Sequence, residues 1–285
     1  MEVIRTVPGL RAACDTARAE GRTVGLVPTM GAFHDGHVSL MRRARAERDL
    51  TVVSIFVNPT QFDDPRDLVA YPRDEERDLH TADGLAIDVA FVPSAEEMYP
   101  PGVAEERITV DPGPLGDRFE GTSRPGHFRG VLTVVVKLFH AVGPCHAYFG
   151  EKDAQQLFLI RRMARELHLP VEVVPCPTVR EPDGLAMSSR NGRLTPEHRT
   201  AAGCLFLALA EAAELTRRGE RDAARLVAAM AREIGATPEA RLDHAAVVNE
   251  ETFAEVRTID RPARALVAAR FGDVRLIDNL LLPAP

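Results

Sequence analysis

Tryptophan is absent from the sequence, and aromatic residues make up only 5% of its 285 positions. A surplus of positive charge is also lacking, because 35 Lys and Arg stand against 42 Asp and Glu and give a formal net charge of −7. Proteins that bind nucleic acid usually carry a basic surplus, since contacts to phosphates supply much of their affinity. The composition is that of an ordinary globular protein and argues against a nucleic acid partner.

Long hydrophobic runs are lacking too. Apolar stretches such as residues 131–136 are far shorter than the roughly 20 residues that a helix needs to cross a bilayer. The N-terminal segment has no basic start followed by an apolar core, as a secretory signal peptide would have. We therefore expect a cytoplasmic protein without a membrane partner.

Paired cysteines are the third absence. The four cysteines, at positions 14, 145, 176 and 204, are scattered and form no Cys-x-x-Cys pair. Their spacing suits neither a zinc site nor a disulfide framework, and we expect reduced, buried thiols. A chain of this length can bury roughly three-quarters of its unfolded surface, so folding requires no such staple.

Strand-like and helix-like segments alternate through the first part of the chain. Apolar and β-branched residues dominate five predicted strands, at residues 23–28, 50–57, 88–92, 147–149 and 171–174. Four helices are predicted between them, at residues 36–48, 74–82, 128–141 and 153–167. This pattern is typical of a parallel sheet covered on both faces. We predict an α/β, Rossmann-like domain over residues 1–178, with its ligand site beyond the carboxyl ends of the strands.

The pattern changes at residues 175–184, where prolines and turn-forming residues indicate a hinge between domains. Alanine-rich helices follow, and Thr195 and Pro196 are typical of a helix start. Three further strands are predicted at residues 242–248, 264–271 and 274–282, the last two joined as a hairpin. The sequence thus predicts a smaller α+β domain over residues 179–285.

A pair of histidines follows the first predicted strand. His34 and His37 lie three residues apart, with Gly36 between them, where a helix is expected to begin. A helix start presents backbone N–H groups and a positive dipole end, which suit a phosphate. Two imidazoles there can donate hydrogen bonds to a phosphate that gathers charge. The alternatives are two surface histidines or half of a metal site, although no matching set of metal ligands lies nearby.

Polar segments also follow the later predicted strands. After the hinge, residues 187–191 read Met-Ser-Ser-Arg-Asn, and their hydroxyls and guanidinium can bind pyrophosphate oxygens or form an ordinary polar loop. Lys152 lies between a strand and a helix, where it can reach a triphosphate. Asp153 can cap that helix, bind ribose hydroxyls, or do both. Gln155 and Gln156 come next, and glutamine in such a helix is more often a surface residue than a ligand.

The second predicted strand ends at Asn58 and Pro59, which turn the chain out of the sheet. Gln61 can then face the same crevice as His34. A neutral amide suits a polyhydroxy acid because it both donates and accepts hydrogen bonds. A plain turn is the alternative.

These segments together resemble a known family. The His34-to-His37 motif is similar to the HIGH motif of nucleotidyltransferases, which include class I aminoacyl-tRNA synthetases, and residues 187–191 resemble their KMSKS loop. The segments PTMGAFHDGH, SIFVNPTQF, YPRD, RPGHFRGV, FGEKDAQQL and VREPDGLAMSSRN have the order and spacing of the pantothenate synthetase family, over most of residues 24–192. The C-terminal domain resembles that family chiefly in ALVAARFGDVRLIDN, and Asp35 is one small departure from its pattern.

The resemblance implies an enzyme that makes pantoyl-adenylate from pantoate and ATP and then passes the pantoyl group to β-alanine. It implies that His34, His37 and Lys152 are catalytic, with His37 as the proton donor. Gln61 and Gln156 are implied to hold pantoate, and Gln61 also β-alanine. The implied ATP site comprises Met30, Gly31, Ala32, Phe33, His34, Asp35, Gly36, His37, Gly150, Glu151, Lys152, Asp153, Val179, Met187, Ser188, Ser189 and Arg190.

The resemblance also implies Mg²⁺, bound mainly through ATP phosphates and water, and a homodimer. Asn58, Arg124 and His127 match family segments near the site but have plausible structural roles. Tyr71 and Asp78 are candidates for the surroundings of pantoate and metal, although the acidic run 74–78 is expected to be a solvated helix face.

Two other functions stay open at this point. One is transfer of the nucleotide itself to a phosphorylated acceptor, which the release of free AMP would exclude. The other is a nucleotide-binding or tRNA-binding module without catalysis. The acidic balance and the set of phosphate-binding residues weigh against that module.

Overall fold

The computed structural model describes residues 1–100 and 108–283. Its contacts divide the chain into two compact units. The first comprises Met1–Glu151 and Gln155–Pro177, and the second comprises Lys152–Ala154 and Thr178–Pro285. The short segment around Lys152 therefore groups with the C-terminal residues, although the helix that it precedes belongs to the first unit.

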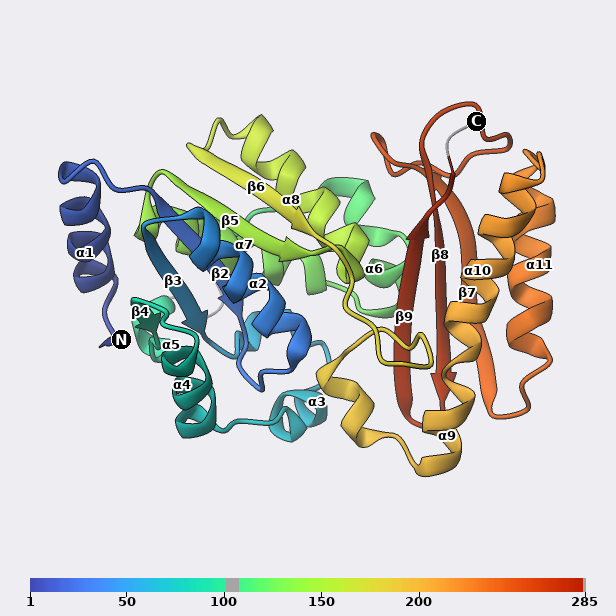
Figure 1. The fold of residues 1–285 in the computed structure, drawn as a ribbon, viewed down its shortest axis with the longest axis horizontal. Helices are drawn as coiled ribbons and strands as arrows, with labels where there is room; N and C mark the ends of the chain where they lie inside the picture. The colour runs from blue at the N-terminus through green and yellow to red at the C-terminus, as the bar shows by residue number, and fades with distance from the viewer. Residues whose placement is uncertain (101–107, 284–285) are drawn as a thin grey trace. The chain divides into compact units, whose positions relative to one another are not determined.

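The first unit is built on a six-stranded sheet in the order β1-β4-β3-β2-β5-β6, with every neighbouring pair parallel. Its strands are β1 (Glu2–Ile4), β2 (Val24–Thr29), β3 (Leu50–Ile55), β4 (Val89–Phe91), β5 (Cys145–Gly150) and β6 (Val171–Cys176). Figure 1 labels β2 to β6 of this sheet, with α2 (Asp35–Glu47) lying over β2. The predicted Rossmann-like parallel sheet is confirmed.

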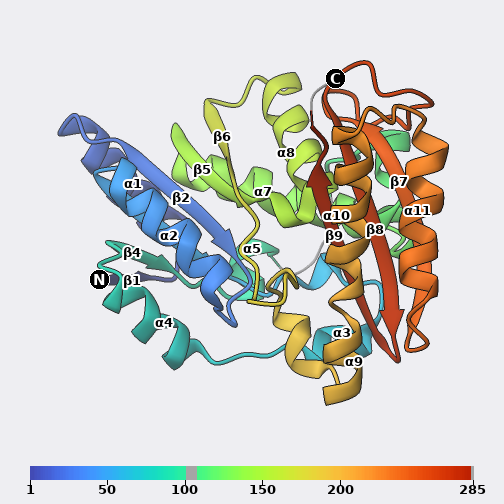
Figure 2. The same cartoon turned by 45° about the vertical axis from the view of Figure 1, so that its right-hand side comes forward.

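Helices cover both faces of this sheet. Successive strand residues point to opposite faces, and both faces carry apolar side chains that must be buried. Leu26 packs in one core cluster with α1 (Val7–Ala19), α7 (His127–Val142) and α8 (Ala154–Glu166). Its neighbour Val27 packs in the other cluster, with α2 and α4 (Glu75–Gly84). Figure 2 shows α2 running alongside β2. Shorter elements complete the unit: η1 (Pro59–Gln61), α3 (Pro65–Ala70), α5 (Ala95–Met98), η2 (Gly113–Asp117), α6 (Glu120–Ser123) and η3 (Glu151–Asp153), which ends in the second unit.

A close backbone contact brings η1 against α7. A Cβ atom on Gly130 of α7 would lie 2.3 Å from the carbonyl oxygen of Thr60, so only glycine fits there. The turn that carries Gln61 is therefore pressed directly onto the helix backbone. This contact sets where the Gln61 amide lies.

Two local features differ from the sequence-based expectations. The first strand and helix, β1 and α1, were not predicted, since β1 is only three residues long. β6 also runs on through Pro175 and Cys176, the first two residues of the predicted hinge. Pro175 is tolerated because β6 is an edge strand, where a missing N–H costs no ladder hydrogen bond.

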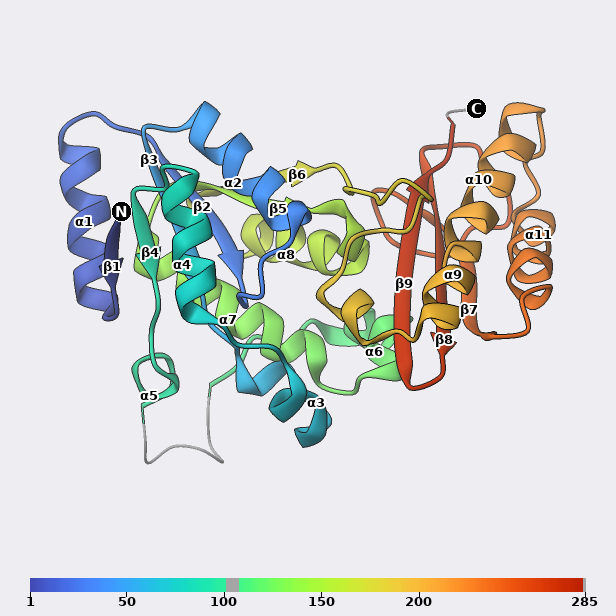
Figure 3. The same ribbon diagram turned by 60° about the horizontal axis from the view of Figure 1, so that its bottom comes forward.

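The second unit contains a three-stranded antiparallel sheet in the order β7-β8-β9. Its elements are η4 (Ser189–Arg193), α9 (Pro196–Ala201), α10 (Cys204–Arg217), α11 (Ala223–Gly235), β7 (Ala240–Asn249), β8 (Ala263–Phe271) and β9 (Val274–Leu281). α10 and α11 pack on one face of the sheet and share its core (Figures 1 and 3). Gly272, at φ 58°, lies in the two-residue turn that joins β8 to β9, so the predicted hairpin and the α+β character are confirmed.

The four cysteines are buried and free, as the sequence predicted. Within residues 1–100 and 108–283, no helix is both long and apolar enough to cross a bilayer.

Candidate active site

The strand order makes one end of the first sheet the candidate ligand site. β2 is central: the chain adds β3 and β4 on one side of it and β5 and β6 on the other. In open parallel sheets, ligands bind beyond the carboxyl ends of the strands where the order reverses in this way. Residues 30–37 follow β2 directly, and Gly150 ends β5, which pairs with β2. Two of the predicted ATP-binding segments thus begin at the reversal point.

The loop after β2 is held by a single carboxylate from α4. Asp78 accepts a hydrogen bond from the backbone N–H of Ala32 at 2.7 Å and another from Phe33 at 2.9 Å. Gly31 has φ +80°, and a Cβ atom there would lie 2.6 Å from Asp78 Oδ2. Gly31 therefore allows both the left-handed turn and the close approach of the carboxylate.

Asp78 corrects one sequence-based expectation. Residues 74–77 of the acidic run are exposed as expected, but Asp78 is only 2% exposed, so the solvated-face interpretation is wrong for it. Burial raises the pKa of Asp78, and the N–H groups of Phe33 and Ala32 offset part of that rise. Sequence analysis missed this role because the partners are backbone groups more than 40 residues away, which leave no mark in the pattern.

His34 and His37 cap the start of α2 reciprocally. His34 Nδ1 accepts from the backbone N–H of Gly36 at 3.1 Å, and His37 Nδ1 accepts from the backbone N–H of His34 at 3.4 Å. The two ring centroids are 4.2 Å apart. An accepting Nδ1 carries no proton, so each neutral ring must carry its proton on Nε2. The capping thus selects the tautomer in which both outer nitrogens are donors.

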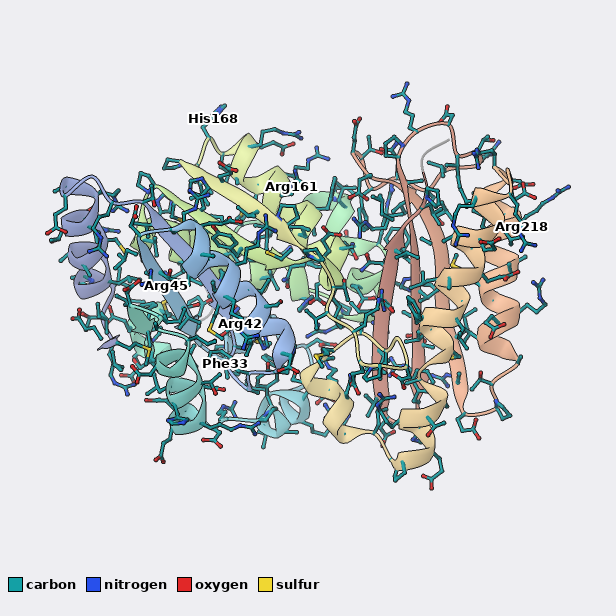
Figure 4. The ribbon with its side chains drawn as sticks, viewed as in Figure 1. Phe33, Arg42, Arg45, Arg161, His168 and Arg218 are labelled. Atoms are coloured by element: carbon teal, nitrogen blue, oxygen red, sulfur yellow. The ribbon has the colours of Figure 1, made fainter. Side chains whose placement is uncertain are left out.

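The side chains on either side of His34 face different environments. Phe33 is 8% exposed and packs in the core cluster beneath α2, where Figure 4 labels it near the start of that helix. Only its backbone is placed to serve a ligand. Asp35 is exposed on the first turn of the helix.

Asn58 and Gln61 form a buried amide pair rather than a plain turn. Asn58 Nδ2 donates to Gln61 Oε1 at 3.0 Å and to the carbonyl oxygen of Gly130 at 3.2 Å. Asn58 Oδ1 accepts from Tyr99 Oη at 2.8 Å and from Thr60 Oγ1 at 2.9 Å. Asn58 is 1% exposed and Gln61 8% exposed. Asn58 therefore fixes the orientation of the Gln61 amide.

The backbone of Gln61 is held from the other side by His127 and Arg124. His127 Nδ1 donates to the Gln61 carbonyl oxygen at 2.8 Å, since a carbonyl can only accept. Its Nε2 atom lies 3.1 Å from Arg124 Nη1, which donates to it. The Gln61 amide Nε2 also reaches Met30 Sδ at 3.1 Å, so two predicted site residues meet. Tyr71 instead packs edge-on against Phe62.

The two glutamines of α8 differ in their surroundings. Gln155 is buried, and its amide bonds the backbone at Leu115, Arg118 and Glu120. The surface expectation is wrong for it, and it holds η2 and the start of α6 in place. Gln156, the predicted pantoate ligand, is half-buried.

In the second unit, residues 179–187 form a small hairpin. Met187 N–H donates to the Val179 carbonyl at 3.0 Å, and Arg180 and Ala186 form a bridge. The structure therefore brings together the two residues predicted to flank adenine. At the hairpin tip, Gly184 has φ +91°, and a Cβ atom there would lie 2.2 Å from the Phe206 ring.

The Met-Ser-Ser-Arg-Asn segment continues from this hairpin into η4. Ser188 Oγ accepts from the backbone N–H of Arg190 at 3.2 Å and so caps the 3₁₀ turn. Asn191 Nδ2 donates to Glu181 Oε1 at 3.0 Å, which ties the turn to the hairpin. Arg199 pairs with both Glu181 and Asp183 at 2.5 Å. The loop is thus a defined structure in its own right.

Lys152 and Asp153 belong to the second unit, with Lys152 Nζ 3.8 Å from Asp153 Oδ1. The Lys152 carbonyl accepts a hydrogen bond from Asn279 Nδ2 at 2.8 Å. Gly150 and Glu151 precede them at the end of β5 and in η3.

A metal cage built from the protein is not found in the part of the chain that the structure describes, where no three His, Cys, Asp or Glu residues could hold a metal ion. Asp78 has both carboxylate oxygens committed to the loop backbone.

Known proteins share this architecture over the whole chain. The crystal structure of pantothenate synthetase from Thermus thermophilus has a TM-score of 0.92 and 48% identity, covering 99% of this chain and 100% of that one. The pantoate-beta-alanine ligase from Francisella tularensis, solved in complex with beta-gamma ATP and beta-alanine, has a TM-score of 0.79 and 33% identity, covering 99% and 97%. Fold and site together define a biosynthetic ligase with a Rossmann-like sheet.

Sequence comparison identifies the particular family. The chain is 55% identical to the pantothenate synthetase of Rubrobacter xylanophilus over 271 residues, 93% of each chain. The profile of the pantoate-beta-alanine ligase family matches residues 2–281. The chain therefore belongs to the pantoate-beta-alanine ligase family, and it is an enzyme with pantothenate synthetase activity.

Asp78→Asn tests the anchor of the loop after β2. Asparagine keeps the shape but turns an NH₂ group toward a backbone N–H, so we expect a loss of about 1–3 kcal/mol in unfolding free energy and a higher KM for ATP. Urea unfolding and steady-state kinetics measure both, with exposed Glu76→Gln on the same helix as the control. Wild-type stability and ATP KM in Asp78→Asn would show that the loop does not depend on this carboxylate.

The same comparison has a pH dependence. The raised pKa means that folded Asp78 keeps its proton at pH values where the unfolded chain has lost it. The stability advantage of wild type over Asp78→Asn should therefore narrow as the pH rises from about 4 through the folded pKa. An advantage that widens over that range would contradict the direction of the shift.

Proposed function

We propose that the chain joins pantoate to β-alanine through a pantoyl-adenylate, releasing pyrophosphate and then AMP. The observation that carries the proposal is the reciprocal capping of His34 and His37 at the start of α2. The Francisella tularensis relative, whose structure is described with beta-gamma ATP and beta-alanine, supports the same substrates here. A carboxylate is a poor electrophile, and a mixed anhydride with AMP gives its carbonyl carbon a good leaving group.

In the first step a pantoate oxygen attacks the α-phosphorus, and the bond from that phosphorus to pyrophosphate breaks. Negative charge gathers on the phosphate oxygens in the transition state. The Nε2–H groups of His34 and His37 and the N-terminus of α2 are donors of the kind that stabilise such charge. His37 is the proposed proton donor, and residues 30–37 line the ATP site.

In the second step the β-alanine amine attacks the activated carbonyl carbon, and the carbon–oxygen bond to AMP breaks. We assign pantoate binding to Gln61 and Gln156, and β-alanine entry to Gln61. The Gln61 amide is supported for this role by Asn58, which holds its Oε1 atom, and by the near-complete burial of both residues. A ligand amide that is already oriented loses little conformational entropy on binding.

The remaining ATP contacts fall to residues carried over from the family. We propose that Lys152, Ser188, Ser189 and Arg190 bind the phosphates, that Gly150 and Asp153 hold the ribose, and that Val179 and Met187 flank the adenine. The hairpin that pairs Val179 with Met187 supports the last assignment. Glu151 also belongs to the proposed ATP site. Bound Mg²⁺ would supply positive charge against the triphosphate.

We further propose that residues 179–285 act as a lid that shields the adenylate from water. An acyl-adenylate hydrolyses readily, so excluding water preserves it for β-alanine. On the family resemblance we propose a homodimer, which sedimentation would test. We propose a cytoplasmic location, which cell fractionation would test, because the reaction consumes ATP.

The adenylate route predicts that exchange of labelled pyrophosphate into ATP needs pantoate and Mg²⁺ but not β-alanine. EDTA should abolish exchange. Release of AMP without β-alanine should be far slower than exchange if water is excluded. Exchange that appears only after β-alanine is added would rule out a separate adenylate step, and AMP release as fast as exchange would rule out the shielding lid.

The histidine assignment predicts a large loss of kcat for a change at either histidine, and for His34→Asn this loss should come without loss of the His34 cap. His34→Asn keeps a good N-cap residue but removes the Nε2–H donor, and His37→Ala removes the other donor. We expect each to lower kcat by about 10²–10³, or ~3–4 kcal/mol, with a smaller effect on ATP binding. His168→Asn, in the exposed turn after α8 (Figure 4), is the control. More than a third of wild-type kcat in His37→Ala would refute its catalytic role.

The adjacent glutamines of α8 provide a matched pair. Gln156→Ala should raise the KM for pantoate about tenfold, a loss of roughly 1.4 kcal/mol, and leave the KM for ATP nearly unchanged. Gln155→Ala should instead lower the unfolding free energy by about 1–3 kcal/mol, because it strands buried backbone groups. Kinetics and thermal unfolding of both variants distinguish them. A Gln156→Ala enzyme that loses ATP affinity and keeps pantoate affinity would refute the assignment.

A further inference from the structure

Asn279 of β9 contacts the backbone of the proposed phosphate-binding lysine. Its Nδ2 atom donates to the Lys152 carbonyl oxygen at 2.8 Å, and both residues belong to the second unit. Asn279 is only 4% exposed. This buried hydrogen bond to the Lys152 carbonyl fixes the backbone position from which the Lys152 side chain extends.

The orientation of the Asn279 amide is determined by its second partner. Arg264 Nη1 donates to Asn279 Oδ1 at 2.5 Å, and a guanidinium has no acceptor. The oxygen must therefore face Arg264 and the NH₂ group must face Lys152. Arg264 is itself held by two hydrogen bonds to Glu250, at 2.8 and 2.9 Å. A chain of polar contacts, with Arg264 and Asn279 buried at its centre, thus runs from Glu250 to the Lys152 carbonyl.

The backbone of Asn279 is held as firmly as its side chain. Its N–H donates to Asp278 Oδ1 at 2.7 Å, and its carbonyl accepts from Arg180 Nη2 at 3.3 Å. Asp278 and Arg180 are joined by two further hydrogen bonds, at 2.6 and 3.0 Å. Arg180 belongs to the hairpin that leads into the Ser188–Arg190 loop. The same point on β9 therefore contacts the Lys152 backbone and the hairpin that precedes the Ser188–Arg190 loop.

We propose that Asn279 is a positioning residue for Lys152, which it holds at a set place relative to the hairpin anchored by Asp278. This inference rests on the proposed role of Lys152 in binding the ATP phosphates. A lysine side chain is long and flexible, so its ammonium reaches a defined point only when its backbone is fixed. A residue without the NH₂ group leaves the Lys152 carbonyl without this donor and lets the turn relax.

Asn279→Asp separates this role from a merely structural one. Aspartate still accepts from Arg264, but it offers no donor to Lys152 and repels the carbonyl oxygen. Arg275→Gln is the control, because Arg275 lies on the same strand and bonds Asp243 instead. We expect Asn279→Asp to lower kcat/KM for ATP in pyrophosphate exchange about 10- to 100-fold, with the KM for pantoate within about twofold of wild type. Arg275→Gln should keep wild-type kinetics.

A double-mutant cycle with Lys152→Ala decides the question. If Asn279 acts through the Lys152 side chain, Asn279→Asp should change the Lys152→Ala enzyme by less than about twofold. Two results would overturn the inference. One is that Asn279→Asp lowers exchange by the same factor in the Lys152→Ala enzyme as in the wild type, and the other is that Asn279→Asp alone keeps wild-type exchange. Asn279→Ser, whose side chain is too short to reach Lys152, repeats the test if the aspartate variant does not fold.

The outcomes also separate the inference from the proposed function. Wild-type exchange in Lys152→Ala would refute the phosphate role of Lys152 and, with it, the basis of the inference. If Lys152→Ala loses exchange while Asn279→Asp keeps the wild-type rate of exchange, only the positioning role of Asn279 is refuted. Thermal unfolding of all variants identifies any loss that comes from global destabilisation.

Discussion

Two backbone N–H groups, those of Ala32 and Phe33, stand in a tight turn where no regular element can pair them. The buried carboxylate of Asp78 satisfies both, and the rest of the first site depends on this contact. It requires glycine at position 31, it ties α4 to the end of β2, and it sets where α2 begins. Once His34 is in place as the N-cap of α2, the reciprocal caps follow and select the imidazole tautomers. These successive backbone contacts thus place two hydrogen-bond donors, the Nε2–H groups of His34 and His37, at the point where the strand order reverses.

A second constraint acts through packing rather than charge. Gly130 lets the backbone of α7 meet the carbonyl of Thr60, and Asn58 then bonds both Gly130 and Gln61. His127 holds the Gln61 carbonyl from the same helix. Each of these groups satisfies another that is buried, so none can be removed without leaving an unpaired polar atom. Because an unpaired buried polar atom costs free energy, the Gln61 amide stays in the one orientation that pairs these groups.

The second unit uses two ion pairs, each with one buried member, for a similar purpose. Arg180 with Asp278 and Arg264 with Glu250 bring charges into a largely apolar core, which gains little stability over a hydrophobic alternative. These ion pairs instead fix the relative positions of the segments they join, because the planar guanidinium can donate to its partners in only one arrangement. These contacts hold β9 to the hairpin that contains Arg180 and to the Lys152 carbonyl.

The sequence by itself determined the alternation of strands and helices, the hairpin of β8 and β9, the buried free cysteines and the family, because these depend on local periodicity, turn residues and ordered motifs. It also located the histidine pair, since a helix start is a local event. Only the tertiary structure decided that Asp78 is buried, that Gln155 supports the fold while Gln156 does not share its contacts, and that Asn279 holds the Lys152 carbonyl. The physical reason is the same in each case: the partner is a backbone group distant in sequence, and a backbone group has the same chemistry whatever residue carries it.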